Sequence, residues 1–214
     1  MKVFVAGQAR TVRTEDLQNY VCKHRRTIKE FDLRTGTFTS IDEDLVKATR
    51  VFSSRISNSE LEWFESTGEN APWGNVKAED ELVHADPFES NGLYQRALSL
   101  WNHFADSAES GVAEAKISKV LHAMRPHFFP VLDSQIRRKY RSYARECAND
   151  LSLGPDVRYA YWAAIREDIT MSLTVLMSLR EDLKSTGGGG LLTEWAEKVS
   201  DVRLHDVVAW SAKS

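Results

Sequence analysis

The sequence contains little cysteine, little proline and no long apolar run, and each shortage excludes a class of protein. Its two cysteines, Cys22 and Cys147, are too few and too far apart for a disulfide framework or a paired zinc site. Five prolines in 214 residues exclude a fibrous or linker-like chain. The longest apolar runs, such as Val3 to Gly7, are far shorter than the roughly 20 residues that span a bilayer. This N-terminal run is also too short for a signal peptide, so we expect a cytoplasmic protein with no membrane partner.

The histidines and glycines do not follow the patterns of a metal or nucleotide site. His122 and His127 are five positions apart, so on a helix they point in different directions. No predicted strand precedes the run from Gly187 to Gly190, which is typical of a flexible link and not of a phosphate-binding loop. We therefore predict no metal and no cofactor.

Hydrophobic residues make up 42% of the chain, as in an ordinary soluble domain. Lys2 to Ala6 is predicted to be a short strand, and Thr27 to Leu33 with Gly36 to Ser40 a small hairpin. We expect these strands to lie outside the helical core. Strand signals stop after residue 40, so we predict a single domain over residues 1–214. It would be mostly α, with a small β/α element at 1–40 and a helical core at 41–214.

Helices are predicted where a capping residue or a break precedes apolar residues at spacings of three and four. The predicted helical segments are Thr14 to Val21, Ser40 to Phe52, Ser57 to Phe64, Leu93 to Phe104, Val112 to Met124, Ser134 to about Cys147, Asp156 to Lys184, Leu191 to Val199 and Val202 to Trp210. Thr14 and Ser40 are the expected N-caps of the first two, and Ser57 to Glu60 open the third. Ser66 to Val76 is predicted to be a loop.

The net charge of −3 conceals a basic segment. Between Lys116 and Arg145 there are eight Lys or Arg residues and one acid, Asp133, which gives this segment +7 and leaves −10 for the rest. A local basic stretch in an acidic protein indicates a nucleic-acid partner. The alternative is a solvated helix face whose Arg stems cover apolar surface.

The segment from Gly111 to Ser134 carries most of the chemical signal. A glycine turn before a helix exposes backbone N–H groups that can bind a phosphate, and Lys116 and Lys119 extend from the same helix. A proline-bounded loop then delivers Asp133 to the start of the next helix. Asp133 is a catalyst or an N-cap, and Lys119 contacts phosphate, pairs with Asp133 or faces solvent.

Other candidates have structural alternatives as well. Arg125, before Pro126, is a substrate clamp or a donor to loop carbonyls, and His122 and His127 are surface or loop residues. Trp63 and Trp73 stack on a base or pack in the core. Three further tryptophans are expected in the core: Trp101, Trp162 and Trp195.

The chain from about Phe31 onward resembles an uncharacterised bacterial family, a domain of unknown function. The resemblance is carried by the glycine turn, "SKVLHAMRPHFFPVLDS", "YWAAI", "LMSLREDL" and "RLHDVVAWS". It is weak before Leu100 and strong after it, and it implies no activity.

More distantly, the same segment resembles the helix-hairpin-helix DNA glycosylase superfamily. Gly111-Val112-Ala113 matches its Gly-hydrophobic-Gly hairpin, with Ala in place of the second glycine. Asp133, 22 positions after Gly111 and preceded by Pro130-Val131-Leu132, matches its catalytic aspartate. Lyase-competent members carry a nucleophilic Lys where this chain has Ala115. The resemblance therefore implies at most a monofunctional glycosylase.

Three interpretations follow from these residues. The first is a glycosylase-like protein that binds DNA, with Asp133 and Lys119 as candidate catalytic residues. Its expected DNA contacts are Gly111, Val112, Ala113, Lys116, Arg125, Arg137, Arg138 and Arg141. The second is a non-catalytic DNA- or protein-binding module of the same fold. The third is an enzyme that acts on a small nucleoside-like substrate.

Overall fold

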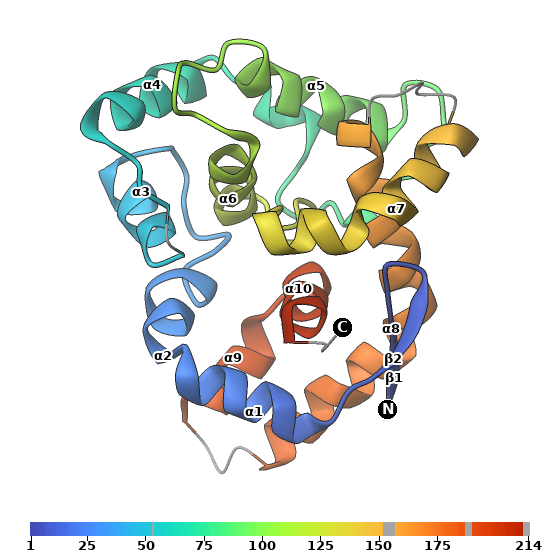
Figure 1. Ribbon diagram of the computed structural model, residues 1–214. Helices are drawn as coiled ribbons and strands as arrows, with labels where there is room; N and C mark the ends of the chain where they lie inside the picture. The colour runs from blue at the N-terminus through green and yellow to red at the C-terminus, as the bar shows by residue number, and fades with distance from the viewer. Residues whose placement is uncertain (53, 152–156, 187–189, 212–214) are drawn as a thin grey trace.

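The computed structural model describes residues 1–52, 54–151, 157–186 and 190–211, and these ranges are mostly α-helical (Figure 1). The sheet within them has two strands, β1 (Lys2–Val5) and β2 (Gln8–Thr11). A mostly α fold with a small N-terminal β element is therefore confirmed. No helix in the described ranges combines the length and the apolar character needed to cross a membrane.

β1 and β2 form an antiparallel hairpin. Its turn residues, Ala6 and Gly7, have φ angles of 54° and 73°. Two-residue turns with positive φ at both positions match the twist of the flanking strands. Val3 and Val5 are buried in the main core, where β1 packs against α8 (Tyr161–Thr186). The expectation that the strands lie outside the helical core is therefore wrong for β1.

The hairpin predicted over Thr27 to Leu33 and Gly36 to Ser40 is wrong. The first part of this segment forms α2 (Arg25–Thr27) and a π-helical turn, η1 (Ile28–Asp32). The buried side chains of η1 are three and four positions apart, which places them on one side of a helical turn. Burial of this face and the ion pair of Asp32 outweigh the strand propensity of the segment.

The early helices are α1 (Thr14–Lys23), α3 (Glu43–Arg50) and α4 (Asn58–Glu69). α4 begins where predicted, and the Ser57 side chain caps it by accepting a hydrogen bond from the backbone of Glu60. The other two starts differ from the prediction. Arg13 occupies the N-cap position of α1, and Asp42 caps α3 in place of Ser40. Asp42 accepts the N–H of Leu45, a bond that Ser40 is too far upstream to make.

The loop predicted over Ser66 to Val76 is partly wrong, because α4 continues through its first residues. Two short 3-10 turns follow, η2 (Trp73–Asn75) and η3 (Leu82–His84).

The later helices follow the predictions closely. They are α5 (Leu93–Ala105), α6 (Glu114–Met124), α7 (Ser134–Asp150), α8, α9 (Leu191–Lys198) and α10 (Asp201–Ser211). α6 ends before Arg125-Pro126, because a residue that precedes proline is disfavoured in the helical conformation. A 3-10 turn, η4 (Val157–Ala160), precedes α8. The predicted helix start at Asp156 and the predicted link at Gly187 to Gly189 lie outside the described residues.

α10 lies inside the helical assembly and contacts α1, α7 and α8 (Figure 1). Every residue from Val202 to Ala209 is buried, including Arg203, His205 and Asp206. Buried charges persist only where they are paired or hydrogen-bonded, so these side chains mark an organised polar interior. α7 begins next to this interior, near the middle of the molecule (Figure 1).

Candidate functional site

A pocket of about 430 Å³ opens where α7 begins, and we call it the α7 pocket. Its volume lies in the range of ~300–1,000 Å³ that is typical of small-ligand sites. Its lining comes from segments far apart in the sequence and includes Tyr20, Phe52, Lys119, Asp133, Arg203 and Asp206. The structure thus brings the two candidate catalytic residues, Asp133 and Lys119, to one pocket.

Asp133 caps α7 with one of its two carboxylate oxygens. Its Oδ1 accepts the backbone N–H groups of Gln135 and Ile136, each at 2.8 Å. Both capping bonds end on Oδ1, so Oδ2 takes no part in the cap. The capping interpretation is therefore confirmed, and it leaves one oxygen of the half-buried carboxylate available to the pocket.

Lys119 is buried, with 6% of its surface exposed, so the solvent-facing alternative is wrong. Its Nζ donates to the carbonyl oxygen of Phe52 at 2.8 Å and lies 5.8 Å from the centre of the Phe52 ring. Burial lowers the pKa of Lys119, and the negative charge of Asp133 opposes this shift. The two residues are electrostatically coupled across the pocket without a direct hydrogen bond.

The loop that carries Asp133 is held by side chains from other helices. Asp206 accepts the N–H of Val131 at 2.9 Å, and the Ser118 hydroxyl oxygen accepts the N–H of Leu132 at 3.1 Å. Both N–H groups are buried, and a buried donor needs a partner. The two residues before Asp133 are therefore fixed by α10 and α6.

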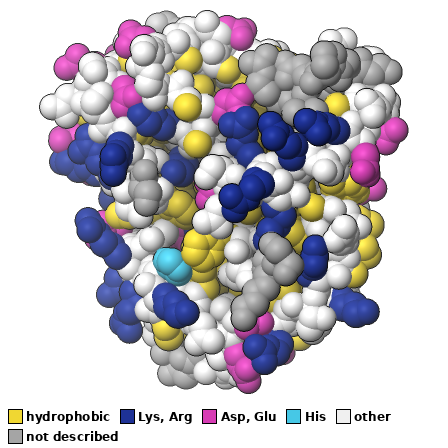
Figure 2. All heavy atoms as spheres, viewed as in Figure 1, with side chains coloured by type: hydrophobic (Ala, Val, Ile, Leu, Met, Phe, Trp, Pro, Cys, Tyr) yellow, Lys and Arg dark blue, Asp and Glu magenta, His cyan; other side chains and the backbone are white. Residues whose placement is uncertain are grey.

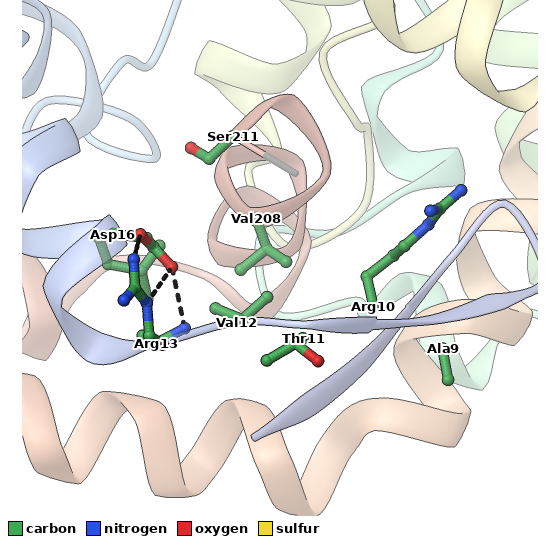
Figure 3. Close-up of a pocket in the computed structure, with 9 residues that line it drawn as sticks. Ala9, Arg10, Thr11, Val12, Arg13, Asp16, Val208 and Ser211 are labelled. Carbon is green, nitrogen blue, oxygen red and sulfur yellow. Dashed lines mark hydrogen bonds and ion pairs between the residues drawn. The ribbon is translucent and has the colours of Figure 1, made fainter. Parts of the chain in front are cut away.

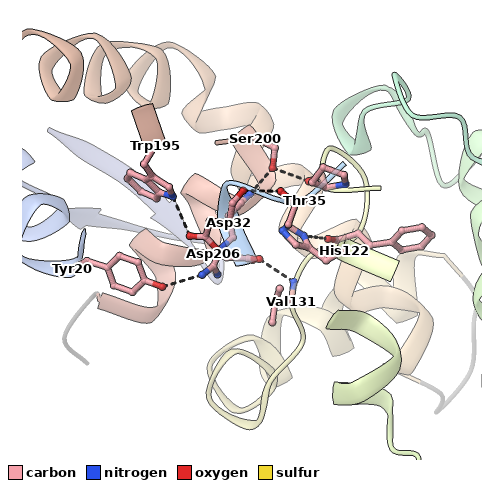
Figure 4. Close-up of polar contacts among 11 residues, drawn as sticks. Tyr20, Asp32, Thr35, His122, Val131, Trp195, Ser200 and Asp206 are labelled. Carbon is pink, nitrogen blue, oxygen red and sulfur yellow. Dashed lines mark hydrogen bonds and ion pairs between the residues drawn. The ribbon is translucent and has the colours of Figure 1, made fainter. Parts of the chain in front are cut away.

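The earlier part of this loop is anchored through its carbonyl groups. Ser200 donates to the carbonyl of Pro126 at 2.7 Å, and Nδ1 of His122 lies 2.6 Å from the carbonyl oxygen of Phe129 (Figure 4). Burial lowers the pKa of His122 to about 3, so the ring is neutral and its Nδ1–H donates to that carbonyl. The expectation of a surface or loop residue is therefore wrong for His122: it is buried in α6, and its Nε2 has no hydrogen-bond partner among the described residues.

A charged network forms the floor of the α7 pocket (Figure 4). Nε of Arg203 lies 3.0 Å from Oδ1 of Asp32, and its Nη2 donates to the Tyr20 hydroxyl at 2.9 Å. Trp195 donates to the other Asp32 oxygen at 3.0 Å. Burial alone would lower the pKa of Arg203, but the Asp32 carboxylate outweighs it and raises the pKa. Arg203 is therefore a fixed cation beneath the pocket, 4.5 Å from the Phe52 ring centre.

Aromatic side chains form the rim of the same pocket. His24 lies between Tyr20 and Trp210, with ring-centre distances of 4.6 Å and 5.4 Å. Trp210 is 40% exposed, and burial lowers the pKa of His24, so that ring is uncharged at neutral pH. A planar ligand that enters the pocket would pass these rings, which offer faces and edges for stacking.

Three of the predicted DNA-contacting cations are engaged inside the protein. Lys116 pairs with Glu60 at 2.5 Å, and Arg137 pairs with Glu114 at 2.9 Å. Arg125 donates to the carbonyl of Val76 at 2.7 Å, as its loop-donor alternative predicted, and it also packs on the ring of Trp73. These contacts reduce the charge that the segment can offer to a phosphate backbone.

The turn before α6 has the backbone that a glycine requires. Gly111 has φ = 97°, and a Cβ atom at this position would lie 2.7 Å from Oε1 of Glu60. Of its neighbours, Val112 is buried and Ala113 is exposed at the N-cap position of α6. The exposed cations of the basic segment lie on α7 and include Arg138, Arg141 and Arg145. Lys and Arg side chains gather over α7 on the face shown in Figure 2.

The tryptophans singled out in the sequence serve packing. The indole of Trp63 donates to the carbonyl of Ser107, and that of Trp73 donates to the carbonyl of Gly68. As predicted, the core contains Trp101, Trp162 and Trp195, and Trp63 is buried as well. The tryptophan of the α7 pocket is Trp210, which sequence reasoning missed.

Sequence reasoning also missed Tyr20, Phe52, Arg203 and Asp206. One signal was available, because Arg203 and Asp206 are charged residues in the segment Val202 to Ala209, which is otherwise apolar except for His205. A spacing of three places them on the same face of a helix. Tyr20 and Phe52 have no comparable signal.

A second hollow, of about 440 Å³, lies between β2, α1 and α10 (Figure 3). Arg13 pairs with Asp16 at its edge, and Arg10 extends away along the strand (Figure 3). Both polar groups at its edge come from exposed or half-exposed side chains. It offers less convergent chemistry than the α7 pocket. No cluster of three or more potential metal ligands is found within the described ranges.

The later two thirds of the chain match one protein family. The family of unknown function DUF6308 covers residues 70–213. The chain belongs to this family. No curated protein and no solved structure matches it. The DUF6308 region contains Lys119, Asp133, Arg203 and Asp206, whereas the pocket residues Tyr20 and Phe52 precede it.

Proposed function

We propose that this member of the DUF6308 family is a helix-hairpin-helix, glycosylase-like protein that binds DNA and excises a base with Asp133. One observation carries the proposal. Asp133 caps α7 through Oδ1 alone, and the same carboxylate lines a pocket of about 430 Å³ with aromatic walls. A base flipped out of a duplex needs a pocket of this kind beside a fixed carboxylate.

The chemistry required of Asp133 is electrostatic. When the glycosidic C1′–N bond breaks, its electron pair leaves with the base and the sugar acquires oxocarbenium character. Oδ2 of an ionised Asp133 would stabilise this positive charge, and water would then bond to C1′ and lose a proton, while the base nitrogen gains one. The anchored loop before Asp133 keeps the carboxylate at a constant position, as electrostatic catalysis requires.

The remaining parts of the proposal concern the DNA backbone. The glycine turn at Gly111 precedes the free N–H groups at the start of α6, a suitable place for a phosphate. Arg138 and Arg141 add exposed positive charge on α7. Lys119 is buried, and its Nζ already donates a hydrogen bond to the Phe52 carbonyl. Its role would therefore be to hold the pocket wall and to balance the charge of Asp133.

A second candidate function is supported by the internal contacts of the basic segment. Because Lys116, Arg125 and Arg137 are engaged within the protein, the surface has fewer cations for a duplex than the sequence suggested. An enzyme that acts on a free nucleoside would use the same pocket without needing them. It would cleave the same type of bond.

A panel of duplexes tests the proposal, each with a single modified or mismatched base. We expect one class of duplex to release a free base and leave an intact strand with an abasic site, because Ala115 offers no Schiff-base amine. Release from nucleosides but not from duplexes would favour the second candidate. Release from neither, with the protein in excess, would contradict both.

A further inference from the structure

The floor of the α7 pocket contains a donor and an acceptor on one helix face. Arg203 and Asp206 are three positions apart on α10, and both line the pocket. Arg203 is paired with Asp32 and not with Asp206, whose Oδ2 is bonded to the backbone of Val131. The two side chains are almost completely buried, with 4% and 2% of their surfaces exposed.

Each of these side chains keeps one polar atom without a partner. Within the described residues, Nη1 of Arg203 donates no hydrogen bond, since its Nε and Nη2 are the atoms that bind Asp32 and Tyr20. Oδ1 of Asp206 likewise accepts none, since Oδ2 binds Val131. Neither atom is among the fully enclosed side-chain atoms that lack a partner, so both reach the pocket, where a ligand can form charge-assisted hydrogen bonds with them. The floor is therefore built to receive a polar ligand edge.

We propose that Arg203 and Asp206 bind the lactam edge of an oxo-base, in which a carbonyl group is adjacent to a ring N–H. The inference rests on the proposed function and specifies its substrate class. Nη1 of Arg203 would donate to the exocyclic carbonyl oxygen, and Oδ1 of Asp206 would accept the ring N–H. Hypoxanthine and uracil carry this edge.

The charges of the two side chains favour an oxo-base over an amino-base. Arginine offers only donors, and an ionised aspartate offers only acceptors. A carbonyl oxygen has two lone pairs and accepts from a cation over a broad range of directions. An amino-base can present only the reversed pair, its ring nitrogen to Arg203 and its amino N–H to Asp206, and an exocyclic amino group is a weaker donor to a carboxylate than the more acidic lactam N–H. Adenine and cytosine therefore match this floor less well.

The Asp206 carboxyl group has the ionised form that this role requires at mildly basic pH. The pKa of Asp206 is raised to about 7, mainly by burial and also by the charges of Asp133 and Asp32, against the opposing effects of Arg203 and the N–H of Val131. At pH 8 its Oδ1 is an acceptor, as the lactam N–H requires. The binding test is therefore made at this pH.

The test measures the binding of free bases to the full-length protein by titration calorimetry, in the matched pairs hypoxanthine with adenine and uracil with cytosine. We expect the oxo-base of each pair to bind roughly 5- to 150-fold more tightly. In Asp206→Asn this preference should fall to within about twofold, because the amide can still accept the Val131 N–H but turns a donor toward the ligand. Asp201→Asn makes the same change on α10 without altering the pocket lining, and it should keep the preference.

Three results would overturn the inference: equal binding within each pair, a preference that Asp206→Asn retains, or no binding of any base by folded protein. These results are independent of base release from DNA. A protein that releases a base from a duplex but shows no oxo-base preference would retain the proposed function and lose this inference. A protein that binds oxo-bases but cleaves nothing would retain the inference and lose the catalytic proposal.

Discussion

Asp206 accepts the backbone N–H of Val131 at 2.9 Å, two residues before Asp133. A carboxyl group buried on α10 thereby holds the loop that delivers the candidate catalytic carboxylate. The pocket floor and the position of Asp133 are consequently coupled through one side chain.

The first prediction concerns the pH dependence of this contact. Burial raises the pKa of Asp206 to about 7, whereas an unfolded Asp titrates near 4. Its contribution to stability is therefore fully present below about pH 4 and is lost as the pH rises toward 7. Asn does not titrate, so the wild type should lose up to about 4 kcal/mol relative to Asp206→Asn between pH 4 and pH 8.

Urea unfolding of both proteins across this pH range measures the difference. The shifted pKa values of His122, His205 and Asp168 affect both proteins alike and cancel in the comparison. A difference that is constant with pH would show that Asp206 is already ionised in the folded protein at low pH, and that the pocket floor is wrongly described.

The second prediction concerns the glycine turn before α6. Gly111→Ala places a side chain at φ = 97° and a Cβ atom 2.7 Å from the Glu60 carboxylate. We expect a loss of about 1–3 kcal/mol in unfolding free energy. Gly74→Ala is the matched control, because nothing lies within 4 Å of its Cβ position and its φ is not positive. Equal stabilities of the two variants would contradict the account of this turn.

The third prediction separates the exposed cations of α7 from those engaged inside the protein. The double charge reversal Arg138→Glu with Arg141→Glu should weaken duplex binding for all sequences. It should also reduce the slope of log affinity against log salt concentration by about two. Reversal of Lys29 and Lys47, exposed on η1 and α3, changes the net charge equally and should have a much smaller effect. Fluorescence anisotropy at several salt concentrations measures both. If the two double variants behave alike, DNA does not bind across α7.

The helices could be predicted from the sequence where caps and apolar spacing agree. α4 begins within the expected opening at Ser57 to Glu60, Asp133 caps α7, and the Arg125-Pro126 step ends α6. The segment after Thr27 failed, because its strand-like composition is outweighed by burial of one helical face and by the pairing of Asp32. Such tertiary contacts leave no trace in local propensity.

The pocket could be predicted only in part. Lys119 and Asp133 are 14 positions apart, and the intervening loop suggested that they would approach each other. The bond between Arg203 and Asp32 joins residues 171 positions apart, and the bond to Tyr20 spans 183. No local pattern encodes a contact of that range. The floor and rim of the site therefore became visible only in the folded protein.

The most direct test of the central claim is base release from duplex DNA by Asp133→Asn. Asn is about as good an N-cap as Asp, so α7 should remain stable to within about 1 kcal/mol while the negative charge is lost. Asp42→Asn, at the N-cap of α3, is the matched control, because it makes the same change away from the pocket.

The measurement is the single-turnover rate of base release, with duplex binding recorded on the same samples. The account predicts that Asp133→Asn releases base at least about 100-fold more slowly than the wild type and than Asp42→Asn, with duplex affinity unchanged. Release by Asp133→Asn at the wild-type rate would contradict it, and Asp133 would then be a helix cap alone.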